Sequence, residues 1–202
     1  MIAHRGGFNL DKKTENSISN SLYTLHHFPS IPLEIDLYYY RENLYITHNS
    51  DQLSIDSLLL SNYLQNLNLD LHILYLDIKM DNKPPLERLI VYLLSNIYAY
   101  PRIEFFIHSN DSELIDTLLN KYHYSKIGFL WNRNKNSIKS VLNYPYLYIV
   151  MNQNDISFYK NIAHLLSIPI YWYTFSNQLE WKMFQRDYQL PQNHKGFIDL
   201  FL

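Results

Sequence analysis

The chain has 202 residues, of which 47% are hydrophobic and 18% charged, a composition typical of a folded protein with one sizeable core and not of a disordered chain. The formal net charge of −2 argues against a basic nucleic-acid-binding surface, so we expect no nucleic-acid partner. The absence of cysteine excludes disulfides, thiolate catalysis and metal sites with sulfur ligands.

Eight apolar runs of strand length follow one another along the chain. Most are continuous rather than alternating, which is typical of strands covered on both faces in a parallel sheet. In chain order they are MIAH (1–4), PLEIDLYYY (32–40), HILYLDIK (72–79), RIEFFIHS (102–109), KIGFLW (126–131), YLYIVMN (146–152), IPIYWYTF (168–175) and GFIDLFL (196–202).

Segments with helical periodicity separate these runs. Residues 18–25 carry apolar side chains at i, i+4 and i+7, and Pro84-Pro85 opens an apolar stripe over 86–97. Asp111 is placed to cap a helix, and Asn177 followed three residues later by Glu180 resembles a capping box. The sequence thus alternates between strands and helices.

This alternation predicts a compact (β/α)8 TIM barrel that spans residues 1–202 as one domain and lacks a helix after its last strand. Such barrels begin at about 200 residues, so this one is at the small end of the range. A doubly wound open sheet is the alternative, because the number of strands does not show that the sheet closes. No linker, repeat or low-complexity segment divides the chain.

One segment departs from the alternation. After PLEIDLYYY the chain has a polar turn, Arg41-Glu42-Asn43, and a second apolar run that ends at His48. This pattern predicts a short hairpin that returns His48 to the neighbourhood of the second strand.

Ionisable side chains gather at the ends of predicted strands within the first eighty residues. A single Glu-x-Asp pair more often faces solvent or forms an ion pair. The occurrence of several ionisable residues together at predicted strand ends favours a catalytic or metal-binding site. Converging carboxylates suit a hard divalent cation, and carboxylates alone favour Mg²⁺, Ca²⁺ or Mn²⁺ over Zn²⁺. Two histidines beside such an ion suit general acid–base work, and two cationic side chains suit a phosphate. The residues concerned are His4, Arg5, Glu34, Asp36, His48, Asp77 and Lys79.

The same residues carry a resemblance to a known family. The segments IAHRGG (2–7), TEN (14–16), LEID (33–36), THN (47–49) and LDIK (76–79) resemble, in order and spacing, the motifs of the glycerophosphodiester phosphodiesterases. More weakly, YWYTF (171–175) and GFIDL (196–200) resemble the late strands of that family.

The resemblance implies a TIM-barrel enzyme that uses one divalent cation, Mg²⁺, Ca²⁺ or Mn²⁺, to hydrolyse a small-molecule phosphodiester. The substrate class implied is a glycerophosphodiester or a related lipid or polymer headgroup. By position, the resemblance makes His4 and His48 the acid–base pair and Glu34, Asp36 and Asp77 the metal ligands. It makes Arg5 and Lys79 the phosphate contacts, with Glu15 beside the site as a further substrate-binding residue.

Two further residues at strand positions are candidates for the same site. His108 ends the fourth predicted strand, where it could face the cavity, and Trp172 is expected to line the mouth of the barrel and bind substrate.

The sequence departs from the family pattern in several places, one of which is Thr14 where the family usually has Pro. Asp77 stands where the family usually has Glu, and Asn49 stands where an Asp usually follows the second histidine. The small subdomain that the family usually inserts after that histidine is missing, so we expect the site to be open on that side. These departures keep two alternatives open: a degenerate barrel that binds a phosphorylated ligand or a protein, and a lyase that forms a cyclic phosphate.

The sequence also bears on location. No basic segment followed by an apolar run marks a signal peptide, and no uncharged apolar run reaches the roughly 18 residues of a membrane span. We therefore expect a cytoplasmic protein without a transmembrane segment.

Overall fold

The computed structural model describes residues 1–8, 15–54, 57–67, 71–80, 85–132 and 146–200. Thr14 and Pro84, which belong to two of the sequence patterns above, lie outside these ranges. The described elements, in chain order, are β1 (Ile2–Phe8), α1 (Ile18–His27), β2 (Leu33–Tyr40), β3 (Asn43–Ile46), the 3₁₀ turn η2 (Ser50–Gln52), α2 (Leu60–Leu67), β4 (Ile73–Lys79), α3 (Leu86–Ala99), β5 (Glu104–Ser109), α4 (Ser112–Asn120), β6 (Ile127–Leu130), β7 (Tyr148–Asn152), the 3₁₀ turn η3 (Gln153–Asp155), α6 (Ile156–Ile162), the 3₁₀ turn η4 (Ala163–Leu165), β8 (Ile170–Phe175), α7 (Gln178–Asp187) and β9 (Lys195–Leu200).

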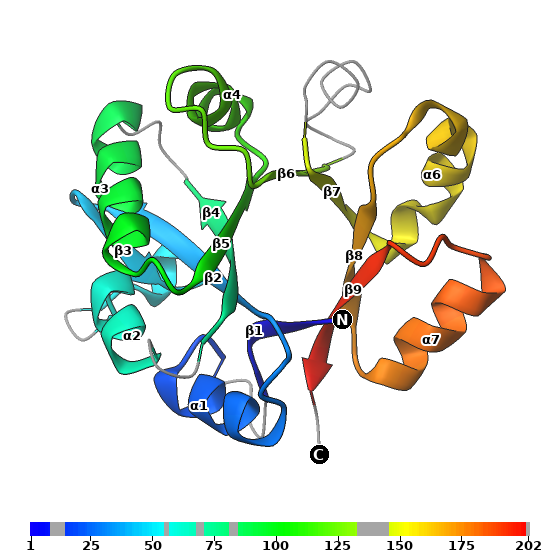
Figure 1. Cartoon of the computed structure of the whole chain (residues 1–202), viewed down its shortest axis with the longest axis horizontal. Helices are drawn as coiled ribbons and strands as arrows, with labels where there is room; N and C mark the ends of the chain where they lie inside the picture. Colours follow the sequence, from blue (N-terminus) through cyan, green and yellow to red (C-terminus); the bar gives the residue numbers. More distant parts are fainter. Residues whose placement is uncertain (9–14, 55–56, 68–70, 81–84, 133–145, 201–202) are drawn as a thin grey trace.

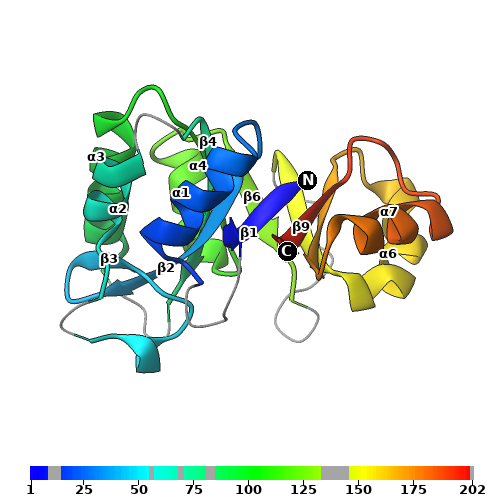
Figure 2. The ribbon, with the colours of Figure 1, turned by 90° about the horizontal axis from the view of Figure 1, so that it is seen from below.

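The strands close into a barrel, as the sequence predicts. The described strands form one sheet in the order β1-β9-β8-β7-β6-β5-β4-β2-β3, and β1 also pairs with β2. All pairs within the ring are parallel, and the second pairing of β1 excludes the open doubly wound sheet. Helices α1 to α4 pack around one side of the ring and α6 and α7 around the other (Figure 1), which Figure 2 shows from below.

The predicted hairpin is present. Strand β3 runs antiparallel to β2 in a register that extends from Leu37 opposite Ile46 to Tyr40 opposite Asn43. The turn residues Arg41 and Glu42 adopt positive φ values of 46° and 65°. The hairpin extends β2 beyond the barrel. Strand β3 then brings the chain back towards Glu34 and Asp36 on β2, and His48 follows shortly after the end of β3.

Two predicted helix starts are also confirmed. Asp111 Oδ1 accepts a hydrogen bond from the Leu114 N–H at 2.8 Å and caps α4. Asn177 Oδ1 accepts from the Glu180 N–H at 2.9 Å and caps α7. In a standard capping box the Glu180 carboxylate would accept from the N–H of the N-cap residue, Asn177. Here it accepts instead from the N–H of the preceding residue, Ser176, at 2.6 Å.

Apolar side chains form two layers of core. Aromatic rings fill the interior of the barrel, where Tyr148 and Tyr171 stack at a centroid distance of 4.4 Å. A larger layer lies between the strands and the surrounding helices. Side chains alternate along a strand, so most strands of the ring contribute to both layers, whereas the inward positions of β2 carry Glu34 and Asp36.

The first strand bends sharply where it meets α1. Gly6 and Gly7 have φ values of +80° and +94°, which side chains with a Cβ rarely adopt. A Cβ on Gly7 would lie 2.4 Å from Thr24 Oγ1, and the Thr24 hydroxyl donates to the Gly6 carbonyl at 3.1 Å. The two glycines therefore let α1 pack closely against the strand that carries His4 and Arg5.

None of the helices within the described ranges is long and apolar enough to cross a bilayer.

Candidate active site

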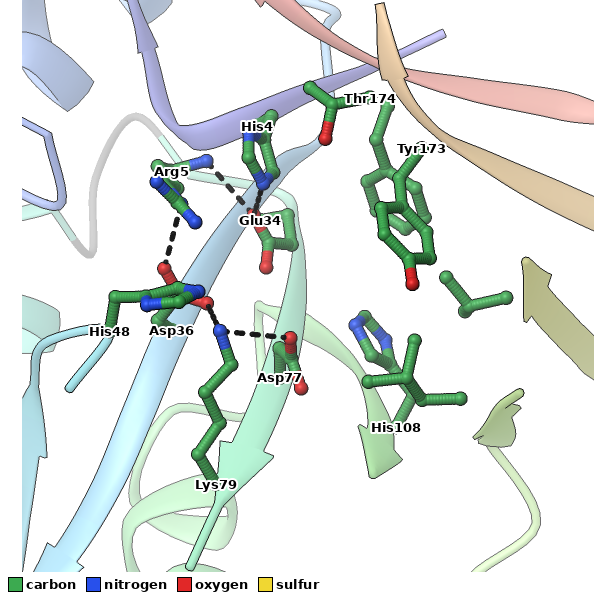
Figure 3. Close-up of a pocket in the computed structure, with 13 residues that line it drawn as sticks. His4, Arg5, Glu34, Asp36, His48, Asp77, Lys79, His108, Tyr173 and Thr174 are labelled. Carbon is green, nitrogen blue, oxygen red and sulfur yellow. Dashed lines mark hydrogen bonds and ion pairs between the residues drawn. The ribbon is translucent and has the colours of Figure 1, made fainter. Parts of the chain in front are cut away.

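A cavity of about 240 Å³ lies within the barrel, and its walls differ in character. One wall is charged and comes from β1, β2, β4 and β5 together with the residue that follows the hairpin; it is formed by His4, Arg5, Glu34, Asp36, His48, Asp77, Lys79 and His108 (Figure 3). The facing wall comes from β6 to β9 and is formed by Leu130, Val150, Tyr173, Thr174 and Phe197. The structure thus brings seven of the predicted site residues, and His108, into one cavity.

Strand register explains this convergence. Residues two apart on a strand share a face, so β2 and β4 each direct successive ionisable side chains into the barrel. Asp36 lies opposite Asp77 in the pairing of β2 with β4, and Asp77 lies opposite His108 in the pairing of β4 with β5. These three side chains therefore form one row across neighbouring strands. Glu34 occupies the preceding inward position on β2, two residues before Asp36.

Asp36 is the centre of an ion-pair network. It is 1% exposed, and its carboxylate accepts from Lys79 Nζ and lies 3.0 Å from Arg5 Nε. The Asn16 side chain donates to Asp36 Oδ2 at 2.9 Å and accepts from the Asp36 N–H at 3.1 Å. Burial alone would raise the pKa of Asp36, but Lys79 and Arg5 outweigh it and hold that pKa well below its usual range.

Lys79 connects this network to the next carboxylate. Its ammonium also lies 3.5 Å from Asp77 Oδ2. Burial would lower the pKa of Lys79, but Asp77 and Asp36 raise it, so the side chain stays charged. Arg5 is fixed in a similar way, because its guanidinium also donates to Glu15 at 2.7 Å.

Glu34 has a different environment from Asp36. It is 2% exposed, and one of its oxygens accepts from the Arg5 backbone N–H at 2.9 Å and lies 4.0 Å from His4 Nε2. Burial raises the pKa of Glu34 to about 7, with His4 acting in the opposite direction. A second positive charge close to this carboxylate would therefore be stabilising.

The side chains present fit a divalent cation. Glu34, Asp77 and His108 each place a ligand atom within 4.8 Å of the others, and all three are buried. Asp77 Oδ1 is buried and has no hydrogen-bond partner among the described residues. Burial lowers the pKa of His108, which keeps its ring neutral, as a ligand requires. Asp36 lies outside this group because its carboxylate faces Lys79 and Arg5; its role as a ligand remains a prediction.

Two of the predicted substrate-binding residues do not reach the cavity. Glu15 lies behind Arg5 and holds its guanidinium. Trp172 is fully buried in the layer between the strands and helices, where its Nε1 donates to His194 Nδ1 at 3.3 Å. Strand alternation directs Tyr171 and Tyr173 inward instead, and Tyr173 takes the place in the cavity wall that was expected for Trp172.

Asn16 is the supporting residue that the sequence analysis did not single out. It is 8% exposed and has a positive φ of 57°, and it satisfies both the backbone and the carboxylate of Asp36. Asn16 is the last residue of the TEN segment, so the family resemblance could have indicated that it belongs to the site.

The environment of His194 predicts a measurable pH dependence of stability. Burial lowers the pKa of His194 to about 4, below the value of about 6.5 in an unfolded chain. The unfolded state therefore binds the proton first as pH falls, so stability is lost between about pH 6.5 and 4. We expect the His194→Gln variant to lose less stability than wild type over this range in urea unfolding experiments. Replacement of the exposed His72 by Gln is the control, and parallel pH profiles for wild type and His194→Gln would contradict the prediction.

Several solved structures with the same fold are phosphodiesterases. No family model matches the sequence, and no curated protein does. Among the solved structures that match, three that each align with 98% of the chain serve as examples. An Oleispira antarctica phosphodiesterase in complex with the product sn-glycerol-3-phosphate is 13% identical, with 91% of its chain covered and a TM-score of 0.72. A glycerophosphodiester phosphodiesterase from Parabacteroides distasonis is 15% identical, with 92% covered and a TM-score of 0.70. The enzyme of the same name from Agrobacterium tumefaciens is 12% identical, with 94% covered and a TM-score of 0.64. These similarities establish the TIM-barrel fold over almost the whole chain.

Proposed function

We propose that the protein is a metal-dependent phosphodiesterase that hydrolyses glycerophosphodiesters or related headgroups by acid–base catalysis with His4 and His48. The observation that carries this proposal is the convergence, in one cavity, of three histidines, three buried carboxylates and two cationic side chains. The structural similarity to phosphodiesterases, one of them in complex with sn-glycerol-3-phosphate, supports the same substrate class.

Glu34 and Asp77 would hold the cation, with Asp36 or His108 as a further ligand. When bound, the cation would supply positive charge to the phosphate and to the charge that develops as the diester is cleaved. The unpartnered Asp77 Oδ1 and the raised pKa of Glu34 both support a cation at this place.

The cationic side chains would hold the phosphate. Arg5 and Lys79 flank Asp36 and are kept charged by it, and both line the cavity. A phosphate oxygen is a better acceptor than water for such groups, because the hydrogen bonds are charge-assisted. Arg5 is held by Asp36 and Glu15, and Lys79 is held by Asp36, so both cations would orient the phosphate before reaction.

The two histidines would move the protons. One takes a proton from the attacking hydroxyl, either of water or of the substrate itself, as the new P–O bond forms. The other gives a proton to the oxygen of the departing alcohol as its P–O bond breaks. Attack by water gives a phosphomonoester and an alcohol, whereas attack by a neighbouring substrate hydroxyl gives a cyclic phosphate.

An activity assay on chelator-treated protein tests the proposal. We expect cleavage of at least one member of a panel of glycerophosphodiesters, or of an aryl phosphodiester, only after Mg²⁺, Ca²⁺ or Mn²⁺ is added back. Phosphorus NMR of the products distinguishes hydrolysis from cyclisation. Absence of cleavage with every cation would contradict the proposal and favour a barrel that only binds a phosphorylated ligand or a protein.

A further inference from the structure

His48 is held by its neighbour in the chain. The His48 ring lines the cavity, and its Nδ1 lies 2.7 Å from Asn49 Oδ1. An amide oxygen can only accept a hydrogen bond, so Nδ1 carries the proton in this contact. In the neutral ring the other nitrogen, Nε2, then has a free lone pair.

The side chain of Asn49 has no other structural task in the described structure. Asn49 stands at the N-cap of η2 with an extended backbone, a position where an Asn side chain ordinarily accepts from the first turn, yet it makes no such bond. Its backbone carbonyl accepts from the Thr47 hydroxyl at 3.2 Å, a contact that does not depend on the side chain. The Asn49 amide is therefore directed to His48 instead of to the turn.

We propose that Asn49 is a positioning residue that holds His48 in the tautomer with a free Nε2, which makes His48 the general base. The assignment rests on the proposed function, in which one histidine must accept the proton of the attacking hydroxyl. That proton moves to Nε2 as the new P–O bond forms, while Nδ1–H remains bound to the Asn49 amide. Because the amide is uncharged, it fixes the ring without adding a carboxylate that would retain the proton on the imidazole.

Nitrogen-15 NMR of histidine-labelled protein at a pH where the ring is neutral tests the tautomer directly. The His48 signals are identified by their loss in the His48→Gln variant. We expect wild-type His48 to be protonated at Nδ1 only, and Asn49→Ala to show a mixture of both tautomers. Asn49→Asp, which keeps an acceptor oxygen, should retain the wild-type tautomer. A wild-type Nε2–H tautomer, or an unchanged tautomer in Asn49→Ala, would overturn the proposal.

Kinetics provide the second readout. We expect Asn49→Ala to lower kcat about three- to tenfold, the worth of one ordinary hydrogen bond, with little change in KM. Asn49→Asp should restore much of this loss. Replacement of the exposed Asn66 on α2 by Ala is the matched control and should leave kcat unchanged.

The two readouts separate the two proposals. If the wild type cleaves phosphodiesters and Asn49→Ala has the wild-type kcat, the role of Asn49 is refuted and the phosphodiesterase function stands. If no phosphodiester is cleaved, the function and the assignment of His48 as general base both fail, whatever tautomer the NMR spectra show.

Discussion

Replacement of either His4 or His48 by alanine is expected to lower kcat by about 10²–10⁴-fold, the usual contribution of a general acid or base. Both rings line the same cavity as the proposed cation ligands, and His4 Nε2 lies 4.0 Å from Glu34. Neither histidine belongs to the group of side chains that fits a cation, so cation affinity should change little. Steady-state kinetics and calorimetric titration of the cation measure the two effects separately, with His72→Ala as the surface control.

A good leaving group distinguishes the two histidines. A nitrophenyl ester departs without being protonated, so it should restore activity only to the variant that lacks the general acid. If His48 is the base, that variant is His4→Ala, and His48→Ala should remain slow on every substrate. Near wild-type rates for both variants on all substrates would refute acid–base catalysis by this pair.

Loss of one of the proposed charged cation ligands is expected to have a comparably large effect on cation binding. Substitutions of residues that merely support a metal ligand cost about 10–100-fold in affinity, so Glu34→Gln and Asp77→Asn should each cost at least about 100-fold. Both variants are close in shape to the wild type, and Asp77 Oδ1 has no hydrogen bond to lose within the described structure. Isothermal titration of Mg²⁺, Ca²⁺ and Mn²⁺ into chelator-treated protein measures the loss.

The same titrations identify the third ligand. Asp36→Asn tests the residue that the family resemblance implies, and His108→Gln tests the residue that lies with Glu34 and Asp77 in the structure. The partly exposed Asp116 on α4, which lies outside the cavity, is replaced by Asn as the control for loss of a negative charge. Wild-type affinity in both Glu34→Gln and Asp77→Asn would exclude the proposed cation site.

The charged wall of the cavity could be predicted from sequence, because the positions of its charged side chains indicate which face of each strand points inward. Charged side chains two apart in apolar strands, such as Glu34 and Asp36, can only be accommodated on one common face. The polar turn at residues 41–43 likewise predicts the hairpin that brings His48 back towards β2. Closure of the ring could not be predicted with the same certainty, because pairing of β1 with β9 leaves no local signal in either strand.

The facing wall lacked such a signal. In β8 every residue from Ile170 to Tyr173 is apolar or aromatic, so nothing in the sequence says which of them faces the cavity. The structure directs Tyr173 inward and buries Trp172 against the helices. The ion pairs and the hydrogen bond that fix Asp36 could not be predicted for another reason, because they join it to residues from three other segments of the chain.

The ring closes only when β1 pairs with β9, from the two ends of the barrel. Contacts with such large sequence separation form late in folding, because the entropy of closing a long loop must be overcome first. An assembly of β1, β2 and β4 would already bring together the charged wall except for His48 and His108, with β1 joined to β2 through one register pair, Ala3 with Leu33. Its aromatic interior would still be open to water and prone to association with other chains. The pairing of β9 with β1 therefore closes the ring and shields this interior from water and from other chains.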